Sequence, residues 1–302
     1  MLAALLWAAY YYFILAAPDA HPAALLAGPF LAGAIGFLAA AWLGGHGRAV
    51  PALFRDPTSY LRAGLLVGMQ VGVLAATYLT GAVDTSLLAL LGDVVCTPIL
   101  IWVLYREGGA RFRSVVFLGG MVLSTVGAGL VIAGGSTLRP ITGWAWVAAP
   151  SVPIVVALYF LFTAKTSQRV PMTALVGQAT LLATLFALAL SPALPGGVAG
   201  LVPPNALDLA LIIGVGLTSF YLGPYLYFLA VEKVGLVLPA LLMTAIPVFT
   251  VLLGVLVDRS LPPWLSLAGI PVATVGAILA LRGPHEPWGT QYASGATRPA
   301  ER

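Results

Sequence analysis

Charged side chains are scarce in this sequence. Of its 302 residues, 8% are Asp, Glu, Lys or Arg, whereas 60% are hydrophobic. A soluble domain carries about 25% charged residues, so this chain has too few charges to cover the surface of a water-soluble fold. Its apolar residues fall in long runs, which predicts an all-α integral membrane protein.

Residues that carry catalytic chemistry are also few. Cys96 is the single cysteine, which excludes an internal disulfide, and His21, His46 and His285 all fall in predicted loops or in the polar tail. The sequence has no metal-ligand cluster, no paired-carboxylate motif and no phosphate-binding loop. We therefore expect no metal, no cofactor, no nucleic-acid partner and no enzymatic activity. A membrane-embedded enzyme acting on lipid or isoprenoid substrates would need such groups.

The apolar runs predict ten transmembrane helices. Polar or Pro- and Gly-rich segments separate them, and Asp84 is expected to cap the fourth helix at its N-terminus. The polar residues 283–302 should form a disordered tail. The predicted helices cover residues 1–17, 22–43, 62–80, 85–105, 114–133, 144–163, 171–191, 208–229, 235–257 and 263–281.

The second half of the chain repeats the first. A shift of 149 positions places Tyr78 on Tyr227 and Pro98 on Pro247, and it aligns two Thr-Val-Gly-Ala blocks that begin at Thr125 and Thr274. The repeat divides the chain into a first five-helix unit (1–134), a linker (135–143), a second five-helix unit (144–282) and the tail (283–302).

The distribution of positive charge predicts the orientation. Of the fourteen Lys and Arg residues, only Arg139 and Arg259 lie in loops on one side of the predicted spans, and the other twelve lie on the opposite side. The positive-inside rule places both termini in the cytoplasm. Since each half has an odd number of spans, the two repeats are inverted, which is typical of secondary transporters.

Each repeat contains an apolar run with a proline, an acidic turn and a Gly-rich helix. In these two copies of one pattern, the chain resembles the drug/metabolite transporter superfamily, in particular its EamA-like branch of ten helices. The resemblance covers about residues 1–282. It departs from the family pattern at Ala8-Ala9, where Gly is frequent, and at Asp258, where Glu is usual. The residues that carry it are Cys96-Thr97-Pro98, Glu107, Gly120 and Thr125-Val126-Gly127, with Ala245-Ile246-Pro247, Asp258-Arg259, Gly269 and Thr274-Val275-Gly276 in the second repeat.

The resemblance implies a function and a general site. Family members export or exchange small metabolites, amino acids or drugs across the cell membrane, often driven by protons or by exchange. The first four helices of each repeat are implied to line a central cavity, with the fifth helices at the periphery. The alternatives are a facilitator or channel-like protein and a scaffold that transports nothing. The sequence leaves the substrate and the oligomeric state open.

Asp93 is the strongest candidate for binding a proton or a cationic group of the substrate. A carboxylate near the centre of a bilayer costs about 2.5–3.5 kcal/mol on insertion scales, and no Lys or Arg lies in the interior of a predicted span to offset that cost. The absence of a buried cation also disfavours polyanionic substrates such as nucleotide sugars. The alternative is a hydrogen-bonded packing residue near the outer mouth.

Further candidates are polar or aromatic residues inside predicted spans. Each has a structural alternative, since amides also join helices and aromatic residues also anchor at membrane interfaces. Pro98 and Pro247 are candidate hinges, because proline in mid-helix removes a backbone hydrogen bond; a fixed kink is the alternative. The remaining candidates for contacting the solute are Gln70, Gln178, Trp7, Tyr11 and Tyr221.

Replacing Asp93 by Asn should abolish solute accumulation driven by a pH gradient, because the amide cannot take up or release the coupling proton. The measurement is uptake into proteoliposomes with and without an imposed gradient. Transport that keeps the wild-type pH dependence in Asp93→Asn would contradict a role for this carboxylate in coupling.

Overall fold

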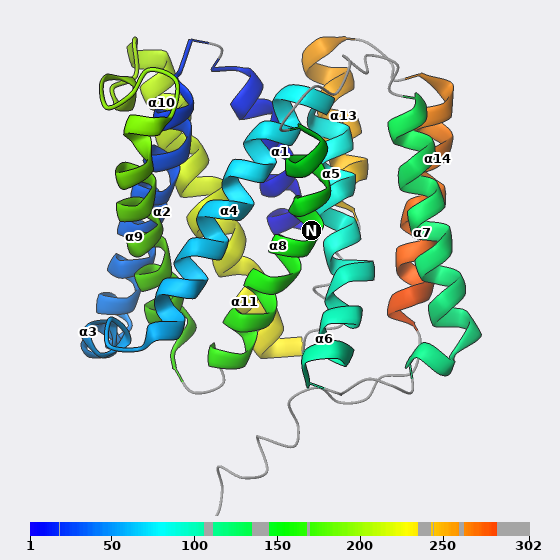
Figure 1. Cartoon of the computed structure of the whole chain (residues 1–302), viewed down its shortest axis with the longest axis horizontal. Helices are drawn as coiled ribbons and strands as arrows, with labels where there is room; N and C mark the ends of the chain where they lie inside the picture. The colour runs from blue at the N-terminus through cyan, green and yellow to red at the C-terminus, as the bar shows by residue number, and fades with distance from the viewer. Residues whose placement is uncertain are drawn as a thin grey trace, which may run out of the picture.

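The chain forms an upright bundle of helices, shown in Figure 1. The computed structural model describes residues 1–17, 19–105, 111–134, 145–167, 170–234, 243, 245–259 and 263–282. These ranges contain helices and no strands. Six of the helices are long and apolar enough to cross a membrane, and four shorter apolar helices accompany them. The described part of the chain therefore has the architecture of a multi-pass membrane protein.

The helices follow the sequence in two similar series. In the first half they are α1 (Leu2–Leu15), α2 (Pro22–Leu43), α3 (Val50–Leu53), α4 (Pro57–Thr80), α5 (Ala82–Leu91), α6 (Thr97–Tyr105) and α7 (Val115–Gly134). In the second half they are α8 (Ala145–Ser167), α9 (Met172–Leu190), α10 (Ala206–Val215), α11 (Gly223–Val234), α13 (Ile246–Asp258) and α14 (Trp264–Leu281). Two π-helical segments, Gly92–Cys96 and Gly216–Leu222, join α5 to α6 and α10 to α11.

Two predicted helix starts are wrong. The third span was expected from residue 62, but α4 begins at Pro57, where the carboxylate of Asp56 accepts a hydrogen bond from the Thr58 amide at 2.9 Å. A proline in the first turn lacks only an amide hydrogen that would be unpaired there anyway. Asp84 was expected to be an N-cap, yet it lies inside α5, whose N-cap is Gly81 with a φ of 95°.

Some predictions fall outside the described residues. These are the linker 135–143, Glu107 and the tail 283–302.

The helix starts follow the same shift of 149 positions as the sequence repeat. Helix α4 begins at Pro57 and α10 at Ala206, and α7 begins at Val115 and α14 at Trp264. The N-caps of α4 and α10 also correspond, since Asp56 and Asn205 each accept a backbone hydrogen bond through their side chains. The two halves thus share these helix starts and this N-cap, although few of their residues are identical.

Helices α7 and α14 pack against each other in antiparallel fashion at one edge of the bundle (Figure 1). A Cβ atom added at Gly127 would lie 2.6 Å from Cα of Ala273, and one at Gly276 would lie 2.7 Å from Cα of Ser124. These two contacts are equivalent under the shift, because Gly276 corresponds to Gly127 and Ala273 to Ser124. Small residues permit this close backbone approach, which is common between helices in membranes.

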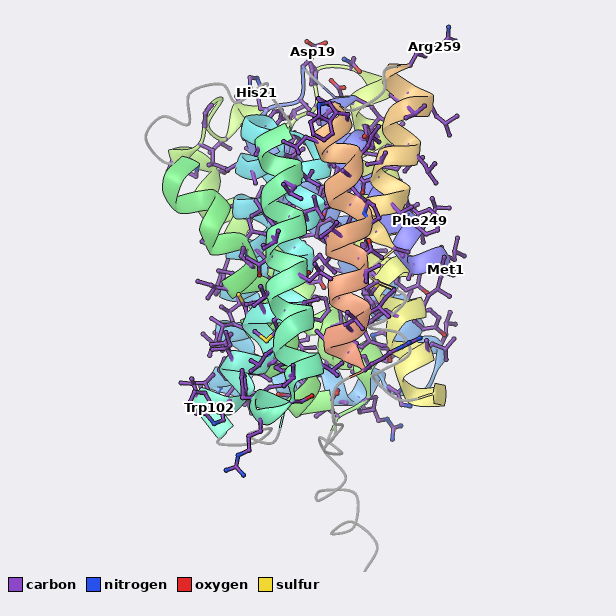
Figure 2. The ribbon with its side chains drawn as sticks, turned by 90° about the vertical axis from the view of Figure 1, so that its right-hand side faces the viewer. Met1, Asp19, His21, Trp102, Phe249 and Arg259 are labelled. Atoms are coloured by element: carbon purple, nitrogen blue, oxygen red, sulfur yellow. The ribbon has the colours of Figure 1, made fainter. Side chains whose placement is uncertain are left out.

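Corresponding helices α6 and α13 end at opposite ends of the bundle. Figure 2 shows Trp102, near the end of α6, at one end, and Arg259, directly after α13, at the other. Asp19 and His21, in the connection from α1 to α2, lie at the same end as Arg259. The helices α6 and α13 therefore run in opposite directions.

The close contact between α7 and α14 leads to a prediction about the stability of the protein. Gly127→Ala should lower the thermal unfolding midpoint in detergent, because the added methyl group meets the Ala273 backbone, and such overpacking costs about 1–3 kcal/mol. Gly129→Ala is the matched control, since a Cβ there has no neighbour within 4 Å and alanine favours a helix by about 1 kcal/mol. Equal midpoints for the two variants would contradict the packing described here.

Candidate functional site

A cavity of about 130 Å³ lies among α1, α4, α5, α8, α9 and α11. This volume is large enough for several waters or a small organic molecule. Aromatic and aliphatic side chains form most of its wall. The aromatic residues are Trp7, Tyr10, Tyr11, Tyr159, Phe160, Phe220, Tyr227 and Phe228, and the others are Leu66, Met69, Gln70, Val73, Ser86, Ala89, Leu90, Val156, Val176, Thr180, Ser219, Pro224, Met243 and Ile246.

Two buried polar groups of the wall have unused hydrogen-bonding capacity. The hydroxyl of Tyr10 lies close to the side chain of Gln70. Neither this hydroxyl nor Nε2 of Gln70 makes a hydrogen bond of acceptable geometry to any described residue. Buried polar groups normally have partners, so this pair is the part of the wall best suited to bind a polar group of a solute.

The hydroxyl groups of Ser86 and Thr180 in the wall donate hydrogen bonds to backbone carbonyls. Ser86 donates to the carbonyl of Val83 at 2.7 Å, and Thr180 donates to the carbonyl of Val176 at 2.6 Å. Each donates its single hydrogen within its own helix, so these side chains can offer a solute only acceptor lone pairs.

Hydrogen bonds at Trp7 connect α1 to the π-helical segment Gly216–Leu222. Its indole N–H donates to the carbonyl of Ser219 at 2.9 Å, and the Ser219 hydroxyl donates to the carbonyl of Leu6 at 3.0 Å. A Cβ added at Gly223 would lie 3.0 Å from the Trp7 indole nitrogen. The indole N–H is therefore used for structure, and Trp7 presents its ring to the cavity.

Three aromatic rings from different helices form one side of the wall. The ring centroids of Trp7 and Phe160 are 6.3 Å apart, those of Trp7 and Tyr227 are 5.8 Å apart, and those of Phe160 and Tyr227 are 6.1 Å apart. These separations lie in the range favoured by aromatic pairs. The three rings make an apolar surface that α1, α8 and α11 hold in place.

The wall contains four pairs of residues that are 149 positions apart. In each pair, one member comes from the first half of the chain and the other from the second. The pairs are Trp7 with Val156, Tyr10 with Tyr159, Tyr11 with Phe160, and Gln70 with Ser219. Equivalent positions of the two halves thus face one common space.

The predicted site residues fall into two groups. Trp7, Tyr11 and Gln70 line the cavity. Gln178 is fully buried outside the lining, with no described partner for either amide atom. Tyr221 also lies outside the lining and packs its ring against Phe37 at 5.2 Å.

Asp93 lies in the π-helical segment that joins α5 to α6. Its side chain is outside the described part of the structure, so its role stays a prediction.

The two candidate hinge prolines occupy the second positions of α6 and α13. Pro98 lies two residues after the π-helical segment Gly92–Cys96, and the hydroxyl of the intervening Thr97 donates to the carbonyl of Gly92 at 2.9 Å. The mid-helix position predicted for Pro247 is wrong, because α13 has Ala245 as its N-cap. Because Pro247 lies in the first turn of α13, it costs no intrahelical hydrogen bond. Whether either residue acts as a hinge stays a prediction.

Sequence reasoning missed most of the aromatic wall. Tyr159, Phe160, Phe220 and Phe228 were not candidates, because aromatic residues inside apolar runs read as ordinary core. The repeat carries a signal that identifies two of them, since the shift from Tyr10 and Tyr11 arrives at Tyr159 and Phe160.

The prediction that no span contains a buried cation is wrong. Arg62 was expected at the boundary between a polar loop and the predicted span 62–80, but it lies in the second turn of α4, and its side chain is completely buried. The error followed from the late predicted start of α4.

No group of three or more potential metal ligands occurs among the described residues.

The fold and its cavity define a class, namely a helical membrane protein with a partly open cavity between its helices. Residues 141–282 match the model of the EamA-like transporter family, which belongs to the drug/metabolite transporter superfamily. This match confirms the resemblance identified from the sequence motifs. Members of this family are transporters rather than enzymes, which points to a membrane transporter of this type.

The fold extends over the whole chain in a solved protein. This chain aligns with the crystal structure of another protein with a TM-score of 0.68 and 20% sequence identity. The alignment covers 98% of this chain and 96% of the other. At this identity the likeness concerns the fold alone. No curated protein matches the sequence.

The contact between Trp7 and Ser219 makes a second stability prediction. Trp7→Phe keeps an aromatic ring but removes the indole N–H, which leaves the Ser219 carbonyl without this donor and should cost about 1 kcal/mol. The measurement is the thermal unfolding midpoint in detergent. Trp102→Phe is the control, because Trp102 is largely exposed at the end of α6. An unchanged midpoint in Trp7→Phe would contradict the importance of this hydrogen bond.

Proposed function

We propose that this protein is a secondary transporter that moves a small organic solute across the cell membrane by alternating access. Residues 1–134 and 144–282 are two inverted repeats of five transmembrane helices, and the cavity between them is the solute site. Both termini face the cytoplasm, and the physiological direction is export or exchange.

The observation that carries this proposal is the pairing of equivalent residues around the cavity. Tyr10 and Tyr159, and Gln70 and Ser219, come from the same positions of two halves that run in opposite directions. Two near-equivalent halves around one site can exchange conformations, so that each closes the side of the cavity that the other had closed. The symmetric contacts between α7 and α14 support the same arrangement.

The cavity wall favours a particular kind of solute. No Lys, Arg, Asp or Glu occurs among the lining residues that the structure describes. The aromatic rings suit an apolar or aromatic body, and Gln70 with Tyr10 can bind one or two polar groups. An amino acid, metabolite or drug with a compact apolar part fits this description. Protons are the candidate coupling ion, through Asp93.

The test is counterflow in proteoliposomes. Vesicles preloaded with an unlabelled solute should take up the same labelled solute faster than empty vesicles, because each solute-bound carrier returns loaded. Gln70→Leu should reduce uptake about tenfold, since one lost hydrogen bond to a polar group in a buried site costs roughly 1.4 kcal/mol. Leu185→Ala is the control, because Leu185 on α9 is half exposed at the bundle surface.

The other outcomes identify the alternatives. Downhill flux without acceleration by preloaded solute would indicate a facilitator or channel. A panel of amino acids, organic cations and aromatic metabolites without any flux would contradict transport and favour a scaffold.

A further inference from the structure

A cluster of polar side chains around the buried Arg62 connects α4 to α8 near one end of the cavity. The guanidinium group of Arg62 lies at its centre and donates to Thr166 of α8 at 2.9 Å, to Thr58 at 2.9 Å and to Ser59 at 2.6 Å. Its fourth contact is an ion pair of 3.5 Å with Asp56. We refer to these five residues as the Arg62 cluster. It joins helices that belong to the two different halves of the chain.

The hydroxyl groups of the Arg62 cluster are oriented to accept from the guanidinium. Thr166 donates its own hydrogen to the carbonyl of Phe162, Ser59 donates to the carbonyl of Leu53, and Thr58 donates to the carboxylate of Asp56. Each oxygen is then left with lone pairs for Arg62. Hydrogen bonds to a charged donor are stronger than neutral ones, so the contact between Arg62 and Thr166 holds α4 and α8 together at this end.

The same cluster is incompletely satisfied. Nε of Arg62 is buried without a described hydrogen-bond partner, and so is the hydroxyl of Thr163, which precedes Thr166 by three residues on α8. Burial raises the pKa of Asp56, but hydrogen bonds from Thr58 and the charge of Arg62 outweigh it, so the pKa of Asp56 is below its ordinary value. Asp56 is therefore ionised at neutral pH. Water that enters on separation of α4 and α8 would satisfy the unpaired groups, which favours an interaction that can break and re-form.

The cluster lies directly next to the cavity. Leu66, one helical turn beyond Arg62, lines the cavity, and so does Tyr159, which lies in the neighbourhood of Arg62. Separation of α4 from α8 at Arg62 would therefore open a path to the site.

The equivalent position in the other half has no such interaction. The shift of 149 positions relates Arg62 to Leu211 and Thr166 to Ala17. These two apolar residues line a separate small cavity of about 10 Å³ between α1 and α10. The two ends of the bundle are thus closed by different chemistry, one by an ion pair with hydrogen bonds and the other by apolar side chains.

We propose that the Arg62 cluster is a latch that holds the cavity closed at the end of the bundle where α4 begins. Its release is the event that opens this end, whereas the opposite end opens by separation of apolar surfaces. The latch therefore biases the resting population towards the state closed at the Arg62 end. This inference rests on the proposed alternation of access, and it adds the residue that sets the preference between the two states.

The experiment measures access to the cavity without requiring transport. Val176 of α9 lines the cavity and belongs to neither latch helix. Val176→Cys, combined with Cys96→Ser, provides a single thiol whose labelling by a membrane-impermeant maleimide reports opening. Oriented vesicles allow the reagent to be added to either face. Arg62→Gln should raise the labelling rate from the Arg62 side about tenfold, as expected for a tenfold larger open population.

Two further variants separate the latch from general effects. Thr166→Val removes only the acceptor on α8 and leaves Asp56, Thr58 and Ser59 in place, so it should raise labelling from the same side by a smaller factor. Arg55→Gln removes the same charge from an exposed position of the preceding segment and should leave the rate unchanged. Because Thr166→Val retains the ion pair between Arg62 and Asp56, it remains informative if Arg62→Gln fails to fold.

The outcomes distinguish this inference from the proposed function. Wild-type labelling rates in folded Thr166→Val and Arg62→Gln would overturn the latch, even if counterflow is observed. Faster labelling from both faces to the same extent would also overturn it, because it would indicate a loosened bundle. Faster labelling confined to the Arg62 side would support the latch, and counterflow in the same vesicles would test transport separately.

Discussion

The lack of water in the surroundings of these helices constrains every other feature of the molecule. In a hydrocarbon environment an unpaired backbone amide or carbonyl costs several kcal/mol, so the chain satisfies its backbone within helices. The exceptions are informative. The π-helical segment Gly216–Leu222 forms part of the cavity wall, and Gly92–Cys96 continues α5, another helix of that wall. Side chains support them, as the Trp7 indole does at Ser219 and the Thr97 hydroxyl at Gly92.

Two kinds of contact hold the helices together. Between α7 and α14, glycines bring backbones into direct contact, which leaves no space for a solute and little freedom for movement. Around the cavity, large aromatic rings keep the helices apart, and polar groups such as the Gln70 amide remain unpaired. The first contact suits a fixed support, and the second suits a region that binds and changes shape. Arg62 belongs to neither kind, because it connects the halves through charge and hydrogen bonds.

Much of the fold could be predicted from the sequence because apolar runs in a membrane have few alternatives. The predicted span 22–43 has the same bounds as α2, and the predicted end of the third span coincides with that of α4 at Thr80. The start of α4 was missed because the polar residues Thr58, Ser59 and Arg62 are more typical of a loop than of a membrane-spanning helix. Their side chains are satisfied by one another and by α8, a partner that is distant in sequence and could not be identified from local pattern.

The sequence by itself determined the helical membrane character, the repeat of 149 positions and the likeness to the EamA-like transporter family, because these depend on composition, spacing and short motifs. Only the tertiary structure decided which side chains share the cavity. Gln70 and Gln178 are the same residue type in similar apolar surroundings, yet one lines the cavity and the other is buried elsewhere. The rotation of a helix about its axis depends on its neighbours, and that information is spread over distant parts of the chain. The burial of Arg62 was decided in the same way, by Thr166 on another helix.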